Sequence, residues 1–275
     1  MNYQNDIDII LSHRFNQGWD YWTTPDFRLS KGSPFSLLES VSYLLELGMD
    51  QNHPIMQSCA KIIFNTWKEK GGFKIDPNGS TYPCHTIHAA NILCQMGYVL
   101  DIRIQKTLEY LLEIQSEDGG WRCLKFSYGK GEETNSSNPF PTLIALNIFR
   151  FTDNYQNNDA LIKAVNFLLE HWVTRKPLGP CHYGIGSLFM DVEYPFRTYN
   201  LFNYVYILSF YKQARKDLRF IEAFKMLESK LCDQQVIVRR VVPKLAKLTF
   251  CEKDKPSELA TKRFEEIRFN LTKDN

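Results

Sequence analysis

Residues 101–114 carry the hydrophobic pattern of an amphipathic helix. Apolar side chains stand at positions 104, 108, 111, 112 and 114, which places them on one helical face. Asp101 is a suitable N-cap, because its carboxylate can accept hydrogen bonds from the first turn. Gly119 and Gly120 permit the positive φ that ends a helix, and Trp121 follows with a large apolar side chain. The pattern therefore predicts a helix that ends in a glycine–aromatic loop.

The same order of features recurs along the chain. Prolines followed by Phe or Cys open the first helix of each copy, spaced 49, 56 and 56 residues apart, at Pro34, Pro83, Pro139 and Pro195. The second helices open 58 residues apart, at Asp101, Asp159 and Asp217, with an earlier copy near Asn52. Gly71-Gly72-Phe73 is a weaker copy of the glycine–aromatic loop. Two helices per period of about 50 residues predict a stacked array of helical hairpins.

The predicted helix pairs are 35–48 with 53–69, 84–97 with 101–116, 140–151 with 159–173, and 196–212 with 217–231. A lone helix within residues 1–30 precedes them. A closing helix follows from Pro256 to Leu271, with Ser257 in a capping box. The secondary structure of residues 236–249 is not decided by the sequence, because their valine-rich start also suits a short strand.

The two helices of each pair differ in polarity. The first helices are apolar around their whole circumference, as in 143–149 and 201–211, whereas the second helices carry Lys and Glu on one side. A helix that is apolar all round is buried on all sides. The first helices are therefore expected to form an inner layer and the second an outer layer. This predicts an all-α fold, an α/α toroid of roughly five hairpin units, complete or incomplete.

Composition narrows the class of protein. The 275 residues contain no Gly/Ser/Pro-rich linker between the similar copies, so we expect residues 1–275 to form a single domain. A net charge of +2 argues against a nucleic-acid partner. No apolar run approaches the roughly 18–20 residues of a transmembrane segment. Without a recognisable secretory signal, the seven scattered cysteines indicate reduced thiols and a cytoplasmic location.

The loop motif resembles that of a known family. Gln115, Gly119 and Trp121 match the QW repeat of squalene cyclases and other terpenoid cyclases. The paired helices are similar to the fold those cyclases share with the β subunits of protein prenyltransferases. Stretches 84–123 and 249–261 also resemble bacterial proteins labelled as prenyltransferase or squalene-cyclase repeat proteins. The resemblance implies an α/α toroid and an isoprenoid or other hydrophobic substrate in a central cavity.

The reactive residues of those families do not carry over. Class II terpenoid cyclases use an Asp-x-Asp-Asp segment as the acid, and the nearest acidic pair here is Asp191 and Glu193. Prenyltransferase β subunits bind zinc through Asp-x-Cys and a distant His, and Glu193 stands where that Cys would be. The Tyr-His pair that prenyltransferase β subunits carry in a later inner helix corresponds to Tyr199-Asn200 in this sequence. The match therefore concerns fold more than chemistry.

Asp191 and Glu193 are the candidate catalytic acids. A general acid for an alkene needs a carboxyl group kept protonated by an apolar environment or by a second carboxylate. The alternative is that these acids only interact with the dipole of the following helix. Both interpretations remain open at the level of the sequence.

Aromatic side chains on or near the predicted inner helices are candidate substrate-binding residues. They are Phe140, Tyr183, Phe196, Tyr199, Phe202 and Tyr206. Aromatic faces stabilise cationic intermediates, and they also form apolar walls for an isoprenoid chain. The alternative is that these rings simply fill the core.

Two Cys/His pairs are candidate metal ligands. Cys84 and His88 are four residues apart on one helical face, and Cys181 and His182 stand in the long loop before the fourth pair. Thiolate and imidazole groups suit tetrahedral zinc, although the spacing matches no familiar zinc motif. The alternative is that Cys84 packs in the core and that His85 or His88 hydrogen-bonds a loop. No other cofactor is expected.

Two functions remain in view. One is a terpenoid-cyclase-like or prenyltransferase-like protein that acts on or binds an isoprenoid. The other is a non-catalytic scaffold that binds a hydrophobic ligand or a protein partner. The sequence lacks the P-loop, the G-x-G-x-x-G turn, the G-x-S-x-G elbow and the H-E-x-x-H motif. These absences argue against nucleotide hydrolases, dehydrogenases and α/β-hydrolases.

Overall fold

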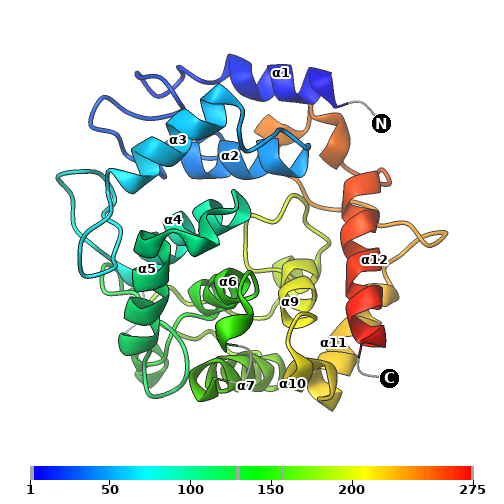
Figure 1. Ribbon diagram of the computed structural model, residues 1–275. Helices are drawn as coiled ribbons and strands as arrows, with labels where there is room; N and C mark the ends of the chain where they lie inside the picture. Colours follow the sequence, from blue (N-terminus) through cyan, green and yellow to red (C-terminus); the bar gives the residue numbers. More distant parts are fainter. Residues whose placement is uncertain (1–2, 128–130, 156–157, 274–275) are drawn as a thin grey trace. The chain divides into compact units, whose positions relative to one another are not determined.

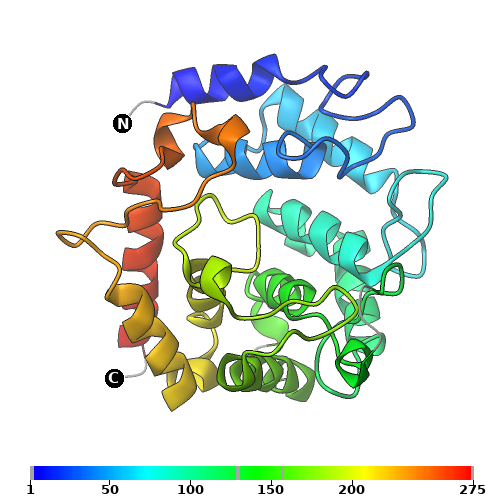
Figure 2. The same ribbon diagram turned by 180° about the vertical axis from the view of Figure 1, so that it is seen from behind.

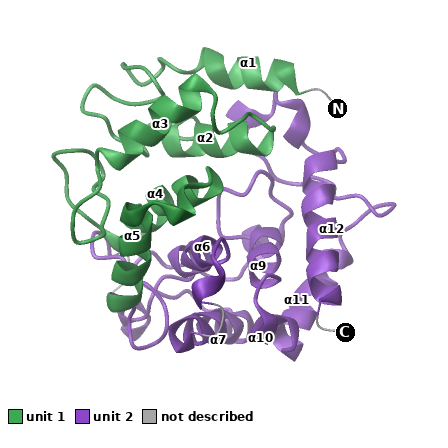
Figure 3. Ribbon diagram, in the orientation of Figure 1, with its two compact units in different colours: residues 1–113 green, residues 114–275 purple. Residues whose placement is uncertain are grey.

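The computed structural model describes residues 3–127, 131–155 and 158–273. Regular structure in these ranges is helical, and β-pairing is limited to isolated bridges. The predicted all-α class is confirmed. None of the helices in the same ranges has the length and apolarity needed to cross a bilayer. The chain divides into two compact units, unit 1 (Met1–Glu113) and unit 2 (Ile114–Asn275), which Figure 3 colours separately.

Unit 1 is built around two neighbouring helices, α2 and α4. Its elements are α1 (Gln4–Ser12), α2 (Leu37–Glu46), α3 (Pro54–Phe64), α4 (Pro83–Gln95), η1 (Tyr98–Leu100) and α5 (Ile102–Glu113). Helix α2 packs against α1, α3 and α4, and α4 packs against α5 (Figure 1). Helices α2 and α4 are therefore the inner members of their hairpins, and α3 and α5 the outer members.

Unit 2 has the same construction around α6 and α9. Its elements are η2 (Glu132–Asn135), α6 (Pro139–Phe149), η3 (Asp153–Tyr155), α7 (Asp159–Thr174), α8 (Ser187–Met190), α9 (Leu201–Leu208), α10 (Lys212–Arg215), α11 (Leu218–Glu228), η4 (Pro243–Leu245), η5 (Thr249–Cys251) and α12 (Glu258–Thr272). Helix α6 packs against α7 and α9, and α9 packs against α11 and α12. Figure 2 shows the loop between α7 and α9, in yellow-green, running in front of α6.

Burial confirms the predicted difference between inner and outer helices for α6 and α9, whereas the inner helix α2 of unit 1 is only partly buried. Every residue of α6 and of α9 is buried. In the outer helix α5 the buried residues are confined to Ile104, Thr107, Leu108 and Leu111, which form one stripe. Buried first helices and amphipathic second helices are the arrangement that an α/α toroid requires. Closure into a toroid, and the single domain over residues 1–275, stay predictions.

The predicted proline openers are right for two helices and wrong for the other two. Pro83 and Pro139 are the first residues of α4 and α6. Pro34 and Pro195 instead lie before their helices, which begin after Ser36 and Asn200. The Ser36 hydroxyl accepts a hydrogen bond from the N–H of the third helical residue, and the Asn200 amide oxygen does the same. These side-chain caps end the preceding loop, so the helices start later than the prolines suggested.

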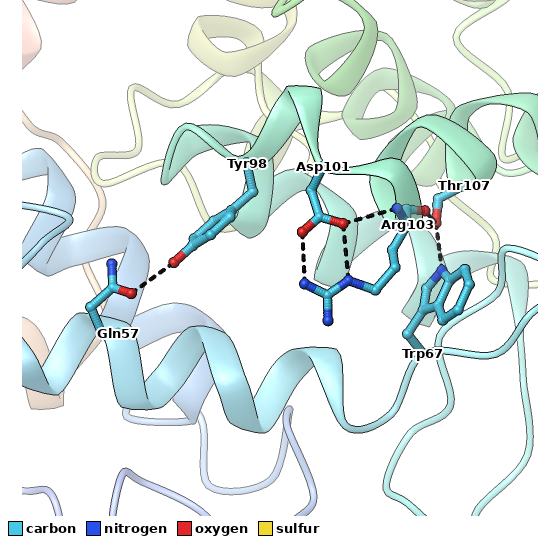
Figure 4. A network of polar contacts seen from close by, with 6 residues as sticks. All are labelled: Gln57, Trp67, Tyr98, Asp101, Arg103 and Thr107. Carbon is cyan, nitrogen blue, oxygen red and sulfur yellow. Dashed lines mark hydrogen bonds and ion pairs between the residues drawn. The ribbon is translucent and has the colours of Figure 1, made fainter.

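Outer helices begin with a repeated side-chain turn. The Asp101, Asn158 and Asp217 side chains each accept the N–H two residues further on, at 2.9, 2.8 and 2.8 Å. Helix α7 begins at Asp159 as predicted, and its cap is the preceding residue, Asn158. Arg103 also binds both oxygens of Asp101, as Figure 4 shows, and Arg219 binds both oxygens of Asp217 in the same way.

The two glycine–aromatic loops share one hydrogen-bond pattern. Phe73 donates its N–H to the hydroxyl of Thr86 in α4 at 3.0 Å. Trp121 donates its N–H to the hydroxyl of Thr142 in α6 at 3.1 Å. In unit 1, Thr107 of α5 also donates to the carbonyl of Gly71 at 2.7 Å and accepts from Trp67, a contact drawn in Figure 4. Each loop thus joins an outer helix to the next inner helix.

Glycine is required in these loops by the outer helices. Gly71 and Gly119 have φ values of +94° and +91°. A Cβ on Gly71 would lie 2.6 Å from the carbonyl oxygen of Lys106, and one on Gly119 would lie 2.6 Å from that of Lys163. The Gln115 side chain completes the second loop, donating to the carbonyls of Gly119 and of Ala160 in α7.

The end of the chain follows the prediction in part. Helix α12 is the closing helix, and the Ser257 hydroxyl accepts the N–H of Ala260 at 3.2 Å. The open segment 236–249 contains η4 and forms only isolated bridges, from Ile237 to Pro256 and from Arg240 to Glu193.

Candidate functional site

The six predicted aromatic residues fall into two clusters, both within unit 2. Phe140, Tyr183 and Tyr199 contact one another, with ring centroids 5.8, 6.0 and 6.5 Å apart. Phe196 separately contacts Phe202 at 4.9 Å and Tyr206 at 5.1 Å. The sequence analysis treated these six side chains as one group, whereas the packing of unit 2 separates them into two.

The first group is named here the Tyr199 cluster: Phe140, His171, Tyr183, Phe189, Tyr199 and Tyr204. Its members come from four helices, α6, α7, α8 and α9, and two loop segments. Phe140 lies in the first turn of α6, His171 near the end of α7, and Tyr183 in the loop that follows α7. Tyr199 contacts Phe189 at 4.8 Å and Tyr204 at 6.4 Å, and it is 6% exposed. Tyr183 is half-buried, so the cluster reaches the surface there.

His171 is a member that the sequence argument missed. Its imidazole is fully buried and stacks on Tyr199, with centroids 5.6 Å apart and planes 17° apart. Nε2 lies 2.9 Å from the Lys176 carbonyl, and Nδ1 lies 2.8 Å from the Tyr199 hydroxyl. A carbonyl oxygen only accepts, so Nε2 carries the proton, and in the neutral ring Nδ1 accepts from Tyr199.

Burial sets the protonation states of this cluster. It lowers the pKa of His171 to about 4, which keeps the imidazole neutral near pH 7. It also raises the pKa of Tyr199 well above its ordinary value, and that of Tyr204 in the same direction. The Tyr204 hydroxyl donates to the Leu168 carbonyl at 3.0 Å. His171, Tyr199 and Tyr204 are therefore uncharged near pH 7, and the hydroxyls of the two tyrosines are turned to internal acceptors.

One sequence signal could have found His171. The buried stripe of α7 is otherwise apolar, and His171 stands within it between Leu169 and Trp172. A polar residue on such a stripe must find partners inside the protein. The stripe shows that a partner is needed, but the partner itself, Tyr199, is 28 residues away.

The second group consists of Phe196, Phe202 and Tyr206, and Arg150, the C-cap of α6, lies beside it. Tyr206 is 4% exposed, donates to the Glu266 carboxylate at 2.9 Å, and has its pKa raised to about 12 by burial. The Arg150 guanidinium lies over the rings of Tyr206 and Phe210, at 5.3 and 4.2 Å. Phe202 is fully buried. These contacts are those of a packed core with a charged margin.

The two predicted acids have different surroundings. Asp191 is exposed to solvent. Glu193 is 3% exposed, accepts the Thr198 hydroxyl at 2.6 Å and lies 3.4 Å from Arg240 Nε. Arg240 and the Thr198 hydroxyl therefore both contact this carboxyl group. Whether either residue takes part in a reaction stays a prediction.

The predicted metal ligands belong to different units. Cys84 and His88 lie in α4 of unit 1, where burial lowers the pKa of His88 to about 4. In unit 2, Cys181 is half-buried, and His182 Nε2 lies 3.6 Å from a Glu133 carboxylate oxygen. Across the described ranges no three His, Cys, Asp or Glu side chains gather as metal ligands. The zinc hypothesis would draw on both units and stays a prediction.

Comparison with known proteins is limited to structure. No family model matches the chain, and no curated protein matches it. A solved structure that the chain resembles is the apo type II terpene cyclase MstE from Scytonema, with a TM-score of 0.47 and 15% sequence identity. The match covers 98% of this chain and 74% of that one. Likeness at this level does not decide chemistry.

Proposed function

We propose that this protein binds an isoprenoid-like hydrophobic molecule against the Tyr199 cluster of unit 2. The observation that carries the proposal is the convergence of Phe140, Tyr183 and Tyr199 from separate segments onto shared ring contacts. Ligand pockets are lined mainly by apolar and aromatic side chains with few polar groups. The uncharged state of His171, Tyr199 and Tyr204 supports an apolar ligand in particular. The resemblance of the loop motif to terpenoid cyclases supports the same ligand class.

The surroundings of Asp191 and Glu193 support a protein that binds the molecule without reacting with it. A cyclase-like reaction would need Asp191 or Glu193 as a protonated acid. Asp191 is exposed, and Glu193 lies beside Arg240. Asp191 lacks the enclosed setting of a general acid, and the Glu193 carboxyl group is already engaged by Arg240 and by the Thr198 hydroxyl. The second hypothesis, a non-catalytic binder, therefore fits these two residues better than a terpenoid cyclase does.

The test is a titration of the full chain with farnesene, a hydrocarbon built from isoprene units, followed by intrinsic tryptophan fluorescence. We expect saturable binding to the wild-type protein. Tyr183→Ala removes one ring at the exposed side of the cluster and should weaken binding by about tenfold, equivalent to about 1.4 kcal/mol. The control is Phe269→Ala on α12, where the side chain is 64% exposed.

Two results would refute the proposal. One is the absence of saturable binding to the wild-type chain. The other is an equal loss of affinity in Tyr183→Ala and Phe269→Ala, which would mean that the hydrocarbon adheres to apolar surface in general. Native mass spectrometry of the complex supplies the stoichiometry, for which one molecule per chain is expected.

A further inference from the structure

We infer that the bound molecule carries an oxygen acceptor, and that the side-chain amide of Asn138 recognises it. This inference rests on the proposed function and narrows its ligand class from a hydrocarbon to an oxygenated isoprenoid, such as an alcohol or a carbonyl compound. The observation behind it is a buried N–H donor beside the Tyr199 cluster.

Asn138 is fully buried at the start of α6, and most of its polar groups are paired. Its backbone N–H donates to the Trp121 carbonyl at 3.0 Å, and its carbonyl accepts the Thr142 hydroxyl at 2.8 Å. Its side-chain oxygen accepts the N–H of Cys181 at 3.1 Å. The side-chain nitrogen, Nδ2, has no acceptor among the described residues. An N–H group buried without a partner is costly, so one near a candidate site indicates an acceptor from outside the chain.

The orientation of this amide is determined by its neighbours. The Cys181 N–H can only donate, so the atom that faces it must be the oxygen, and exchanging O and N would bring two donors together. Gly179, at a φ of +74°, packs against the same oxygen, and a Cβ there would collide with it. The Asn138 amide is therefore held in one orientation, with Nδ2 as the group left to bind.

Position connects this donor to the aromatic cluster. Phe140 follows Asn138 by two residues, and Tyr183 follows Cys181 by two residues. The hydrogen bond between Asn138 and Cys181 and the ring contact of 5.8 Å between Phe140 and Tyr183 therefore join the same two segments. A chain lying on these rings would have one end close to the amide. Cys181 and Tyr183 are half-buried, so this part of the cluster adjoins the surface.

Other buried donors without an acceptor fit a ligand less well. They include Ser40 Oγ in unit 1, Gln213 Nε2 in α10 and Trp172 Nε1. The Trp172 side chain packs against the rings of Phe189 and Tyr204, whose faces can accept an N–H weakly. Among these residues, Asn138 is the one that stands beside Phe140 of the Tyr199 cluster.

The test compares farnesyl methyl ether with farnesene on the full chain, using wild-type protein and Asn138→Asp. The ether oxygen can accept a hydrogen bond but cannot donate one. The aspartate keeps an oxygen for Cys181 and replaces the N–H donor by a second oxygen. Affinity for the ether should fall by about tenfold in Asn138→Asp, while farnesene affinity should change by less than about twofold. The matched control is Asn154→Asp, which makes the same chemical change at an exposed residue of η3 and should alter neither titration.

The outcomes separate this inference from the proposed function. If the wild-type chain binds neither probe, the proposed function fails, and this inference fails with it. If both probes bind and respond equally to Asn138→Asp, a water molecule or a local rearrangement satisfies the amide, and the inference alone is overturned. Should Asn138→Asp lose its helical circular-dichroism spectrum, Asn138→Ala gives the same comparison, and an equal response of the two probes again overturns the inference.

Discussion

Acid is expected to destabilise unit 2 through His171. In the folded chain Nε2 donates to the Lys176 carbonyl and Nδ1 accepts from the Tyr199 hydroxyl, inside a fully buried cluster. Protonation would place a charge there and would set a second N–H against a hydroxyl that already donates. Burial accordingly lowers the pKa of His171 from 6.5 to about 4.

The sign and size of the effect follow from this shift. The unfolded chain takes up the proton first as the pH falls, because its imidazole has the higher pKa. Stability is therefore complete above about pH 6.5, falls between about pH 6.5 and pH 4, and changes no further below that range through this group. A shift of about 2.5 units at 1.36 kcal/mol per unit gives a loss of about 3 kcal/mol.

Urea unfolding of wild-type protein and His171→Gln at about pH 7 and about pH 4 measures this loss. Glutamine can donate to Lys176 and accept from Tyr199, but it does not titrate. Between the two pH values the wild-type chain should lose about 3 kcal/mol more than the variant. His88 and the carboxylates titrate in both proteins, so their effects cancel. An equal loss in the two proteins would refute the reasoning, because the proton would then bind folded and unfolded His171 alike.

Two further predictions concern the repeated loops. Gly71→Ala should cost about 1–3 kcal/mol more than Gly48→Ala, because both glycines have positive φ but only at Gly71 would the new Cβ meet a backbone carbonyl, that of Lys106. Urea midpoints of the two variants measure this difference, and equal midpoints would contradict it. Thr142→Val should cost about 1–3 kcal/mol, because the buried N–H of Trp121 loses its acceptor. If Thr142→Val has the same melting temperature as the wild-type protein, this second prediction is wrong.

Local signals predicted the helices well. The stripe at 104, 108 and 111 appears in α5 as buried positions, and Pro83 and Pro139 begin their helices as expected. Such features depend on residues within a few positions of each other, so they can be read without knowing the rest of the chain. The prolines at 34 and 195 misled the prediction, because a proline suits a loop as well as a first helical turn.

The grouping of the candidate site residues, in contrast, could not be predicted from short-range sequence patterns. The aromatic character of Phe140, Tyr183 and Tyr199 is visible in the sequence, but their grouping apart from Phe196 depends on which helices pack together. Glu193 stays a candidate acid, and only the structure shows that Arg240 lies beside it. A charge or a hydrogen-bond partner that arrives from a distant segment changes what a side chain can do.

The sequence by itself determined the all-α class, the hairpin repeat and the division into apolar inner and amphipathic outer helices, because helical periodicity and capping are local. Only the tertiary structure decided that His171 pairs with Tyr199, that Glu193 faces Arg240, and that Asn138 keeps a donor without an acceptor among the described residues. These arrangements join segments far apart along the chain. Their geometry follows from how side chains pack, which no short sequence pattern encodes.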